Sequence, residues 1–240
     1  MRRALFFLAV LIIAGLAQAP RAFTQNPADA VAILDAVKAP YEKIRDYTVD
    51  IRAVVKMTGL SVPPMDAVLS FKKPDRVQLE SDGFAMLPRD AVAFHPAMFE
   101  TDAYDMVVQG SGKVQGIECT KVKLLARSDT TRLQRAMLFI DTKRALILRM
   151  EFDPGAGAKA SATVSYTQVD GKYWLPARID VEMDSPRQFR RPGQQTPSNA
   201  RAQAEKARIT MTYHNYVVNH GIDDAVFEAK TTPSTRRGRK

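Results

Sequence analysis

The hydrophobic positions along the chain change their period once, near residue 46. Between residues 26 and 46 apolar side chains recur every three to four residues, which predicts one helix with an apolar face. Asn26 and Pro27 suit its first positions, and Pro40 is expected to kink or split it. The face expected to pack on a core comprises Ala30, Ile33, Leu34, Val37, Tyr41 and Ile44.

Beyond residue 46 the period becomes two, which is typical of strands with one apolar and one polar face. Within residues 47–57 the odd-numbered positions are apolar, whereas Thr48, Asp50 and Arg52 are polar. A sheet with one wet face is antiparallel. We therefore predict a mainly β fold in which one helix precedes about eight to ten antiparallel strands. The later strand segments are residues 65–71, 76–80, 119–127, 133–141, 145–153, 161–168, 172–183 and 207–218.

Two hairpin turns are predicted within this series. Asp170-Gly171 is a strong hairpin dipeptide between two alternating segments. A tight turn over residues 141–144 is expected to pair, all on one face, Phe139 with Leu146 and Met137 with Leu148.

Two other stretches carry weaker patterns. In the last predicted strand, alternation places Val217 on the apolar face with Met211 and Tyr213, and Tyr216 on the wet face with His214. Residues 81–112 show no sustained period, and we expect a short helix or a loop over the sheet there.

The first residues are expected to be a targeting segment and not part of the fold. Arg2 and Arg3 precede the apolar residues 4–17, and small residues follow, which is the order of a secretory signal peptide. The run is shorter than the roughly 20 residues of a transmembrane helix, so an uncleaved anchor is the less favoured alternative. We expect residues 1–22 to be a signal peptide and the chain to be exported to the periplasm.

The net charge of +9 raises the question of a nucleic-acid partner. Its excess lies in the first residues, in residues 185–206 and in the tail 231–240, which leaves the remaining body close to neutral. We therefore expect no nucleic-acid partner. The chain is also expected to form a single domain over residues 23–230 and to be monomeric. The basic loop and tail are expected to be flexible, with peripheral contact to anionic membrane surfaces as an open alternative.

Candidate chemistry is sparse. The chain contains no G-x-S-x-G, H-E-x-x-H or C-x-x-C motif, and its one cysteine, Cys119, is expected to be a small buried residue. His214 and His220 precede Asp223 and Asp224, but the histidines belong to different elements, whereas zinc needs three or four convergent ligands. Asp223 suits the cap of a short helical turn. We expect no metal, no cofactor and no enzymatic activity.

The apolar face of such a sheet must be covered, and one or two helices cover it only in part. The residue pattern leaves two alternatives open, a tightly packed core or a cavity for an apolar ligand. Ile33, Leu34 and Val37 would form the underside of the covering helix. The candidate cavity residues are Val49, Ile51, Val55, Leu69, Phe71, Leu79, Phe139, Leu148, Ile179 and Met211.

The succession of segments resembles the outer-membrane lipoprotein-sorting family, the LolA-like proteins. Over most of residues 27–230 the segments that carry this resemblance are IRDYTVDIRA, LSFKKPDRVQLE, LFIDTKRALILRMEF, TQVDGKYWLPARI and YHNYVVNHGIDDAVFE. The resemblance implies an incomplete antiparallel β-barrel whose concave apolar face is covered by N-terminal and short helices. It also implies a periplasmic protein that shields the acyl chains of a lipoprotein or lipid, as a step in sorting to the outer membrane, with no bond chemistry.

One position of the family's carrier can be transferred to this chain. The carrier has an arginine that contacts the helical lid and gates the cavity, and the corresponding residue here is Lys73, before Pro74. Lysine retains the charge but lacks the two-pronged guanidinium group. The resemblance also leaves a second function open, a periplasmic sensor or interaction protein that binds a protein of the inner or outer membrane.

Overall fold

The computed structural model describes residues 27–57, 60–81, 94–129, 131, 133–153, 159–184 and 206–228. The predicted signal peptide, the tail and Asn26 lie outside the described residues, and so does the predicted basic loop, except that Lys206 begins a strand.

Helix α1 runs from Pro27 to Glu42 and ends four residues earlier than predicted. It buries the predicted apolar face, and the chain continues through Pro40 as one helix, so the expectation that this proline splits it is wrong. Pro40 lies in the last turn, where few backbone hydrogen bonds remain to be lost. The backbone amides of Lys43 and Ile44 close that turn on the carbonyls of Pro40 and Tyr41.

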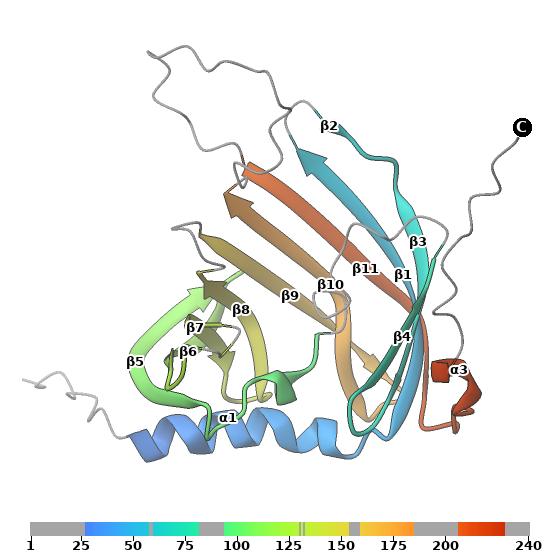
Figure 1. Ribbon diagram of the computed structural model, residues 1–240. Coiled ribbons are helices and arrows are strands. Elements are labelled where there is room, and N and C mark those ends of the chain that lie inside the picture. Colours follow the sequence, from blue (N-terminus) through green and yellow to red (C-terminus); the bar gives the residue numbers. More distant parts are fainter. Residues whose placement is uncertain are drawn as a thin grey trace, which may run out of the picture.

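The strands form one antiparallel sheet in the order β4-β3-β1-β11-β10-β9-β8-β7-β6-β5, with short β2 paired to the end of β1. Edge strands β4 and β5 do not pair with each other, so the sheet is an open, strongly curved half-barrel (Figure 1), as predicted. The strands are β1 Asp46–Met57, β2 Leu60–Ser61, β3 Met65–Lys72, β4 Arg76–Glu80, β5 Tyr104–Val114, β6 Ile117–Ala126, β7 Arg135–Asp141, β8 Leu146–Phe152, β9 Ala160–Val169, β10 Tyr173–Asp184 and β11 Lys206–Val218.

Helices cover the concave side of this sheet. Helix α1 packs against β5 and against the short 3₁₀ helix η2 (Pro96–Met98), and both lie within the opening of the half-barrel (Figure 1). The last helix, α3 (Ala225–Glu228), contacts β4 instead and lies on the outer side. Alternate residues of β1, β3 and β6 face the concave side and are buried there, in agreement with the period of two in the sequence.

Two apolar clusters result. The main core lies on the concave face, where side chains from α1, η2 and the sheet meet. The second cluster consists of Val114, Cys119, Leu146 and Leu148, with Ile117, Phe139, Tyr166 and Trp174 packed against it. Strand alternation places the second cluster on the opposite face, since Leu138 and Ile140, the neighbours of Phe139, belong to the main core.

The β7–β8 hairpin differs from its prediction. Phe139 lies opposite Arg149 and Met137 opposite Glu151, so the predicted pairing is wrong, and a register shift separates Phe139 from Ile140. The connecting turn is also longer than predicted. Ala136, Leu138 and Ile140 are the β7 residues that face the main core, so Phe139 points to the outer face, where it joins the second cluster together with Leu148.

Asp141 stabilises this longer turn. Its carboxylate accepts hydrogen bonds from the amides of Lys143 and Arg144, at 3.0 and 3.3 Å, and from Arg144 Nε at 2.6 Å. Burial alone would raise the pKa of Asp141, yet the hydrogen bonds from Arg144 and Lys143 lower it below its ordinary value. A buried carboxylate at this place is therefore kept ionised by the loop that it organises.

Strand β11 contains a second deviation from simple alternation. Asn215 adopts a positive φ of 55°, and the β1–β11 register shifts beside it, between Thr48 and Asp50. Tyr216 consequently turns inward and packs on Tyr47, whereas Val217 is 48% exposed. The predicted placement of these two β11 residues is thus reversed. The predicted turn at Asp170-Gly171 is confirmed, with φ values of 51° and 63°.

Strand β5 was not predicted, because Gly110 and Gly112 interrupt its alternation. Tyr104, Met106 and Val108 nonetheless alternate and are buried in the main core. Gly110 has a φ of 94°, and the β5–β6 register shifts between Val108 and Ser111. The glycine makes a local bend that a residue with a side chain would resist.

The sheet has a seam between β8 and β9. Their ladder joins only residues 149–152 to residues 160–163, and the two strands then diverge (Figure 1). Across the opening the Tyr166 hydroxyl donates a hydrogen bond of 2.8 Å to the carbonyl of Ile147. Tyr166 packs against both clusters, so at this seam one side chain contacts the apolar residues of both faces of the sheet.

Candidate functional site

The interior between α1 and the sheet is where most of the candidate cavity residues meet. Val55 and Leu79 are partly buried at the edge of the main core, whereas Phe139 and Leu148 lie in the second cluster. The other candidates are buried in the main core: Val49, Ile51, Leu69, Phe71, Ile179 and Met211.

The covering helix presents its predicted underside to this interior. Leu34 and Val37 are fully buried at 0% and 1% exposure, and Ile33 is partly buried against the core. Phe94 and the fully buried Phe99, on either side of η2, add a second piece of cover. The interior is therefore closed in this structure, and the apolar face of the sheet is protected from water by two short elements rather than by a second sheet.

A row of aromatic side chains runs through this interior from α1 to β11. The His95 ring contacts Tyr41 of α1 edge-on, with centroids 5.2 Å apart, and stacks on Phe71 of β3 at 5.1 Å. The row continues from Phe71 to Tyr47 at 5.2 Å and from Tyr47 to Tyr216 at 5.8 Å. His95 thus lies between the helix and the sheet, where separating them would change its surroundings most.

The surroundings of His95 disfavour its charged form. Burial, and to a smaller extent the positive charge of Lys73 nearby, lower the pKa of His95 to about 4. His95 is therefore neutral at neutral pH, and its protonation would place a second positive charge at the contact between the helix and the sheet.

Hydrogen bonds fasten the C-terminal end of α1 to the sheet. Lys73 Nζ donates to the carbonyl of Glu42, the last helical residue, at 2.6 Å. Asn219 accepts from the amide of Arg45 at 2.6 Å and donates to the carbonyl of Lys43 at 3.0 Å. Lys73, the candidate gating residue, thus lies at the point where the covering helix joins the first strand.

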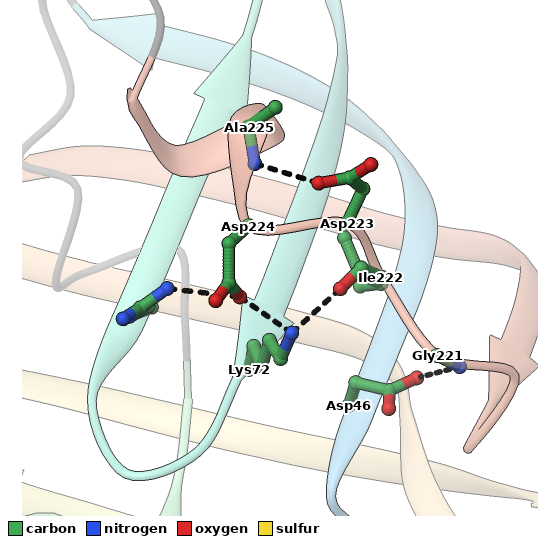
Figure 2. Close-up of polar contacts among 8 residues, drawn as sticks. Asp46, Lys72, Gly221, Ile222, Asp223, Asp224 and Ala225 are labelled. Carbon is green, nitrogen blue, oxygen red and sulfur yellow. Dashed lines mark hydrogen bonds and ion pairs between the residues drawn. The ribbon is translucent and has the colours of Figure 1, made fainter.

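The C-terminal segment, residues 219–228, holds β3 in place beside this junction (Figure 2). Lys72 Nζ donates to the carbonyl of Ile222 at 2.7 Å and to Asp224 Oδ1 at 2.5 Å, and Arg76 Nη1 lies 2.9 Å from the same carboxylate. The hydrogen bond from Lys72 is the main cause that lowers the pKa of Asp224. The segment therefore positions the residue that precedes Lys73.

Asp223 of this segment and Asp46 of β1 each accept a hydrogen bond from a backbone amide of the segment. Asp223 accepts a hydrogen bond of 3.0 Å from the amide of Ala225 and caps α3, as predicted. Asp46, at the start of β1, accepts the amide of Gly221 at 3.1 Å and lies 3.7 Å from His220 Nδ1. These contacts make the stretch a structural fastening.

His214 is exposed on the outer face of β11. Among the described residues, no group of three histidine, cysteine, aspartate or glutamate side chains lies close enough together to hold a metal ion. No helix within the described part of the chain is long and apolar enough to cross a membrane.

Comparison with solved structures identifies the architecture. An outer membrane lipoprotein-sorting protein domain from Vibrio parahaemolyticus superimposes with a TM-score of 0.58, at 14% identity over 84% of this chain and 97% of that domain. The fold is LolA-like. A LolA superfamily protein from Nitrosomonas europaea gives a TM-score of 0.53, at 9% identity over 82% of this chain and 96% of that one. At such identities the LolA-like likeness establishes the fold alone.

A third structure has the same likeness. A DUF1329 family protein from Desulfovibrio piger gives a TM-score of 0.58, at 15% identity over 84% of this chain and 97% of that one. No protein-family model matches the sequence, and neither does any curated protein.

Several residues of the interior escaped the sequence analysis. His95 lay in the stretch without a period, and nothing local indicates its contacts with Tyr41 and Phe71, which are distant in sequence. Asn219 belongs to a residue type common in turns, and its φ of 59° agrees with such a role. Its hydrogen bonds to the helix–strand junction could not have been predicted, because they join residues 174 and 176 positions apart.

Proposed function

We propose that this protein binds the acyl chains of a lipoprotein or lipid between α1 and the concave face of the sheet, in the periplasm. Shielding and handover constitute the mechanism, with no bond made or broken. The observation that carries the proposal is a continuous apolar face covered by α1 and η2, with the polar fastening of α1 at its C-terminal end.

The energetics of acyl chains support such a site. Each methylene removed from water contributes roughly 0.8 kcal/mol, so a chain of about 12 methylenes does not cross water unaided. An interior that holds such a chain must exchange helix side chains for ligand. Leu34 and Val37 bury apolar area that an acyl chain replaces in kind, so displacing the helix costs far less than exposing the sheet.

Lys73 is proposed to set the affinity for the acyl chain by holding α1, the lid of this interior, against the sheet. Its hydrogen bond to Glu42 is a single contact at the partly exposed edge of the interior, and such contacts contribute about 1 kcal/mol. A fastening of this size delays opening without preventing it. It also keeps the affinity finite, which release to an acceptor requires.

The fold also supports sorting of lipoproteins to the outer membrane as the setting of this binding. The donor and acceptor would then be membrane proteins or membrane surfaces, and the basic loop and tail would supply peripheral contact with anionic headgroups. These partners follow from the proposed binding and are not needed for it.

Native mass spectrometry of protein purified from an envelope extract without detergent tests the proposal directly. We expect a mass excess that organic extraction releases as lipid or acylated peptide. A clean mass that stays clean after incubation with labelled fatty-acyl probes contradicts it. That result would favour an interaction protein whose filled interior supports the binding of a protein partner.

A matched pair of variants localises the binding. Val55→Asp puts a carboxylate at the edge of the main core, and Phe139→Asp puts one in the second cluster, at an equally half-buried position of the same sheet. We expect only Val55→Asp to abolish uptake of a labelled acyl probe. Equal uptake by two folded variants would place the ligand elsewhere.

A further inference from the structure

The main core beneath α1 is rich in tyrosine hydroxyl groups. All seven tyrosines of the chain belong to the main core or pack against it. A tyrosine brings an apolar ring and a polar tip, and the tip requires a hydrogen-bond partner once it is buried. The hydrogen-bond partners of these hydroxyls therefore show which of them are satisfied by the protein itself and which can donate to a ligand.

Four of the hydroxyls have a partner within the protein, among them that of Tyr173, which accepts a hydrogen bond of 3.0 Å from Asn219 Nδ2. Tyr216 donates to the carbonyl of Pro176 at 2.8 Å, and Tyr166 to that of Ile147 at the same distance. The Tyr213 hydroxyl contacts the sulfur of Met211 at 3.8 Å. Each of these groups thus has a fixed structural role.

Tyr41 differs from these four. Its side chain is 4% exposed, and its hydroxyl is buried with no hydrogen-bond partner among the described residues. A buried polar group without a partner is strongly destabilising, and native interiors contain few of them. The Tyr41 hydroxyl is therefore a buried donor that a ligand bound in this interior can satisfy.

The place of Tyr41 fits a ligand between helix and sheet. It lies in the last turn of α1, on the underside, with its ring edge-on to His95. Burial is the main cause that raises the pKa of Tyr166, and the Tyr41 hydroxyl nearby is the next. The unused hydroxyl therefore lies near Tyr166, the residue that spans the seam between β8 and β9.

We propose that the Tyr41 hydroxyl donates a hydrogen bond to the carbonyl oxygen of an ester- or amide-linked acyl chain held beneath α1. This inference rests on the proposed function and specifies the ligand class. A phenol in an apolar interior needs an acceptor, and a neutral carbonyl satisfies it without the desolvation penalty of a carboxylate. The carbonyl is the one strong acceptor that an acylated glycerol or cysteine carries at the head of each chain, so the bond also sets the depth of the chain.

The test compares two ligands that differ only in the carbonyl. Ethyl decanoate offers an ester acceptor, and decyl ethyl ether has nearly the same shape without it. Calorimetric titration gives the dissociation constants of both ligands for the wild-type protein and for the variants Tyr41→Phe and Tyr213→Phe. The last is a matched control, since it removes a buried hydroxyl from the same interior.

We expect Tyr41→Phe to weaken ester binding about tenfold, to the level of the ether, and to leave ether binding unchanged. Without ligand, the melting temperature of Tyr41→Phe should equal or exceed that of the wild type, because the variant removes an unsatisfied group. Tyr213→Phe should bind both ligands as the wild type does.

Three results overturn the inference. Unchanged ester binding in Tyr41→Phe means that the hydroxyl is not used. An equal loss for ester and ether means that Tyr41 acts only by packing, and a lower melting temperature without ligand means that the hydroxyl has a structural partner. In each case a wild type that binds both ligands leaves the proposed function standing. A wild type that binds neither contradicts the proposed function and this inference together.

Discussion

The main core and the second cluster lie on opposite faces of one sheet and are closed in different ways. The main core is closed by α1 and η2, which approach the sheet from outside it. The second cluster is closed by the sheet's own hairpins, around the turn that Asp141 organises. A cover that is a separate element can move without breaking strand pairing, whereas a cover made of hairpins cannot.

The two clusters also differ in their polar groups. The main core contains buried tyrosines, a neutral histidine and the unsatisfied hydroxyl of Tyr41. Beside the second cluster lies Asp141, a carboxylate whose hydrogen bonds keep it ionised. The first arrangement is stable only while the helix stays in place, and the second is locked locally. This difference supports the proposal that the ligand binds on the concave side.

The largest effect is expected from cutting side chains out of the two clusters. Leu69→Ala and Leu148→Ala remove equal volume from well-buried positions, and each should lower the free energy of unfolding by about 2–5 kcal/mol. Only Leu69→Ala should also change acyl-probe affinity, because only Leu69 lies beneath the helix. Chemical denaturation and probe titration measure the two effects, and parallel losses of affinity would remove the distinction between the clusters.

A second difference concerns acid. Because the folded pKa of His95 is about 4, below its ordinary value of 6.5, the unfolded chain binds the proton more readily between these values. Stability should therefore fall as the pH drops from about 6.5 to 4, by an amount on the order of 1–3 kcal/mol. The charge would form between Tyr41 of α1 and Phe71 of β3, with Lys73 close by, so the main core is the cluster that weakens.

The variant His95→Phe should abolish that slope, since phenylalanine keeps the ring contacts and cannot be protonated. Melting temperatures between pH 7 and 4 measure it. The control is His214→Gln, which alters an exposed histidine on the outer face and should keep the wild-type slope. A slope that persists in His95→Phe would assign the acid sensitivity to other groups.

Asp141 should give the second cluster a different pH window. Its pKa is lowered on folding, so its contribution is present above the unfolded value of 3.8 and is lost as the pH falls through the folded value. Asp141→Asn should lower the free energy of unfolding by roughly 1–2 kcal/mol at pH 7. Denaturation at pH 7 and pH 2 should show this difference shrink at the lower pH, and an unchanged difference would contradict the role of the charge.

The sequence predicted the parts of this comparison that depend on local period. The alternation of β1 and β3 identified the concave face, and Asp170-Gly171 identified a turn, because both signals lie within a few residues. The assignment of Phe139 and Leu148 failed because β7 and β8 carry apolar residues on both faces. Where both faces are apolar, alternation shows which residues share a face but not which face is the concave one.

The candidate site was predictable in its apolar part and not in its polar part. Leu69 and Leu34 follow from amphipathic patterns, whereas the contacts of Tyr41 and His95 arise when distant segments meet. One local signal was available in β11. Asn215 is a residue type that tolerates positive φ, and a bulge there accounts for the inward turn of Tyr216.

The smallest expected effect concerns the fastening of the lid. Lys73→Met removes the hydrogen bond to Glu42 while keeping the side chain's length, and the matched control Lys43→Met alters an exposed lysine whose side chain lies just beyond the helix. Because one partly exposed hydrogen bond is lost, the free energy of unfolding should fall by less than about 1 kcal/mol. The lid should respond more than the whole fold does, since the bond joins the helix to the sheet and not strand to strand. Hydrogen exchange of the α1 amides should therefore quicken in Lys73→Met alone, while the amides around the second cluster keep the wild-type rate. Equal exchange of α1 in both variants would show that Lys73 does not hold the lid, and that the contacts of Asn219 are sufficient for it.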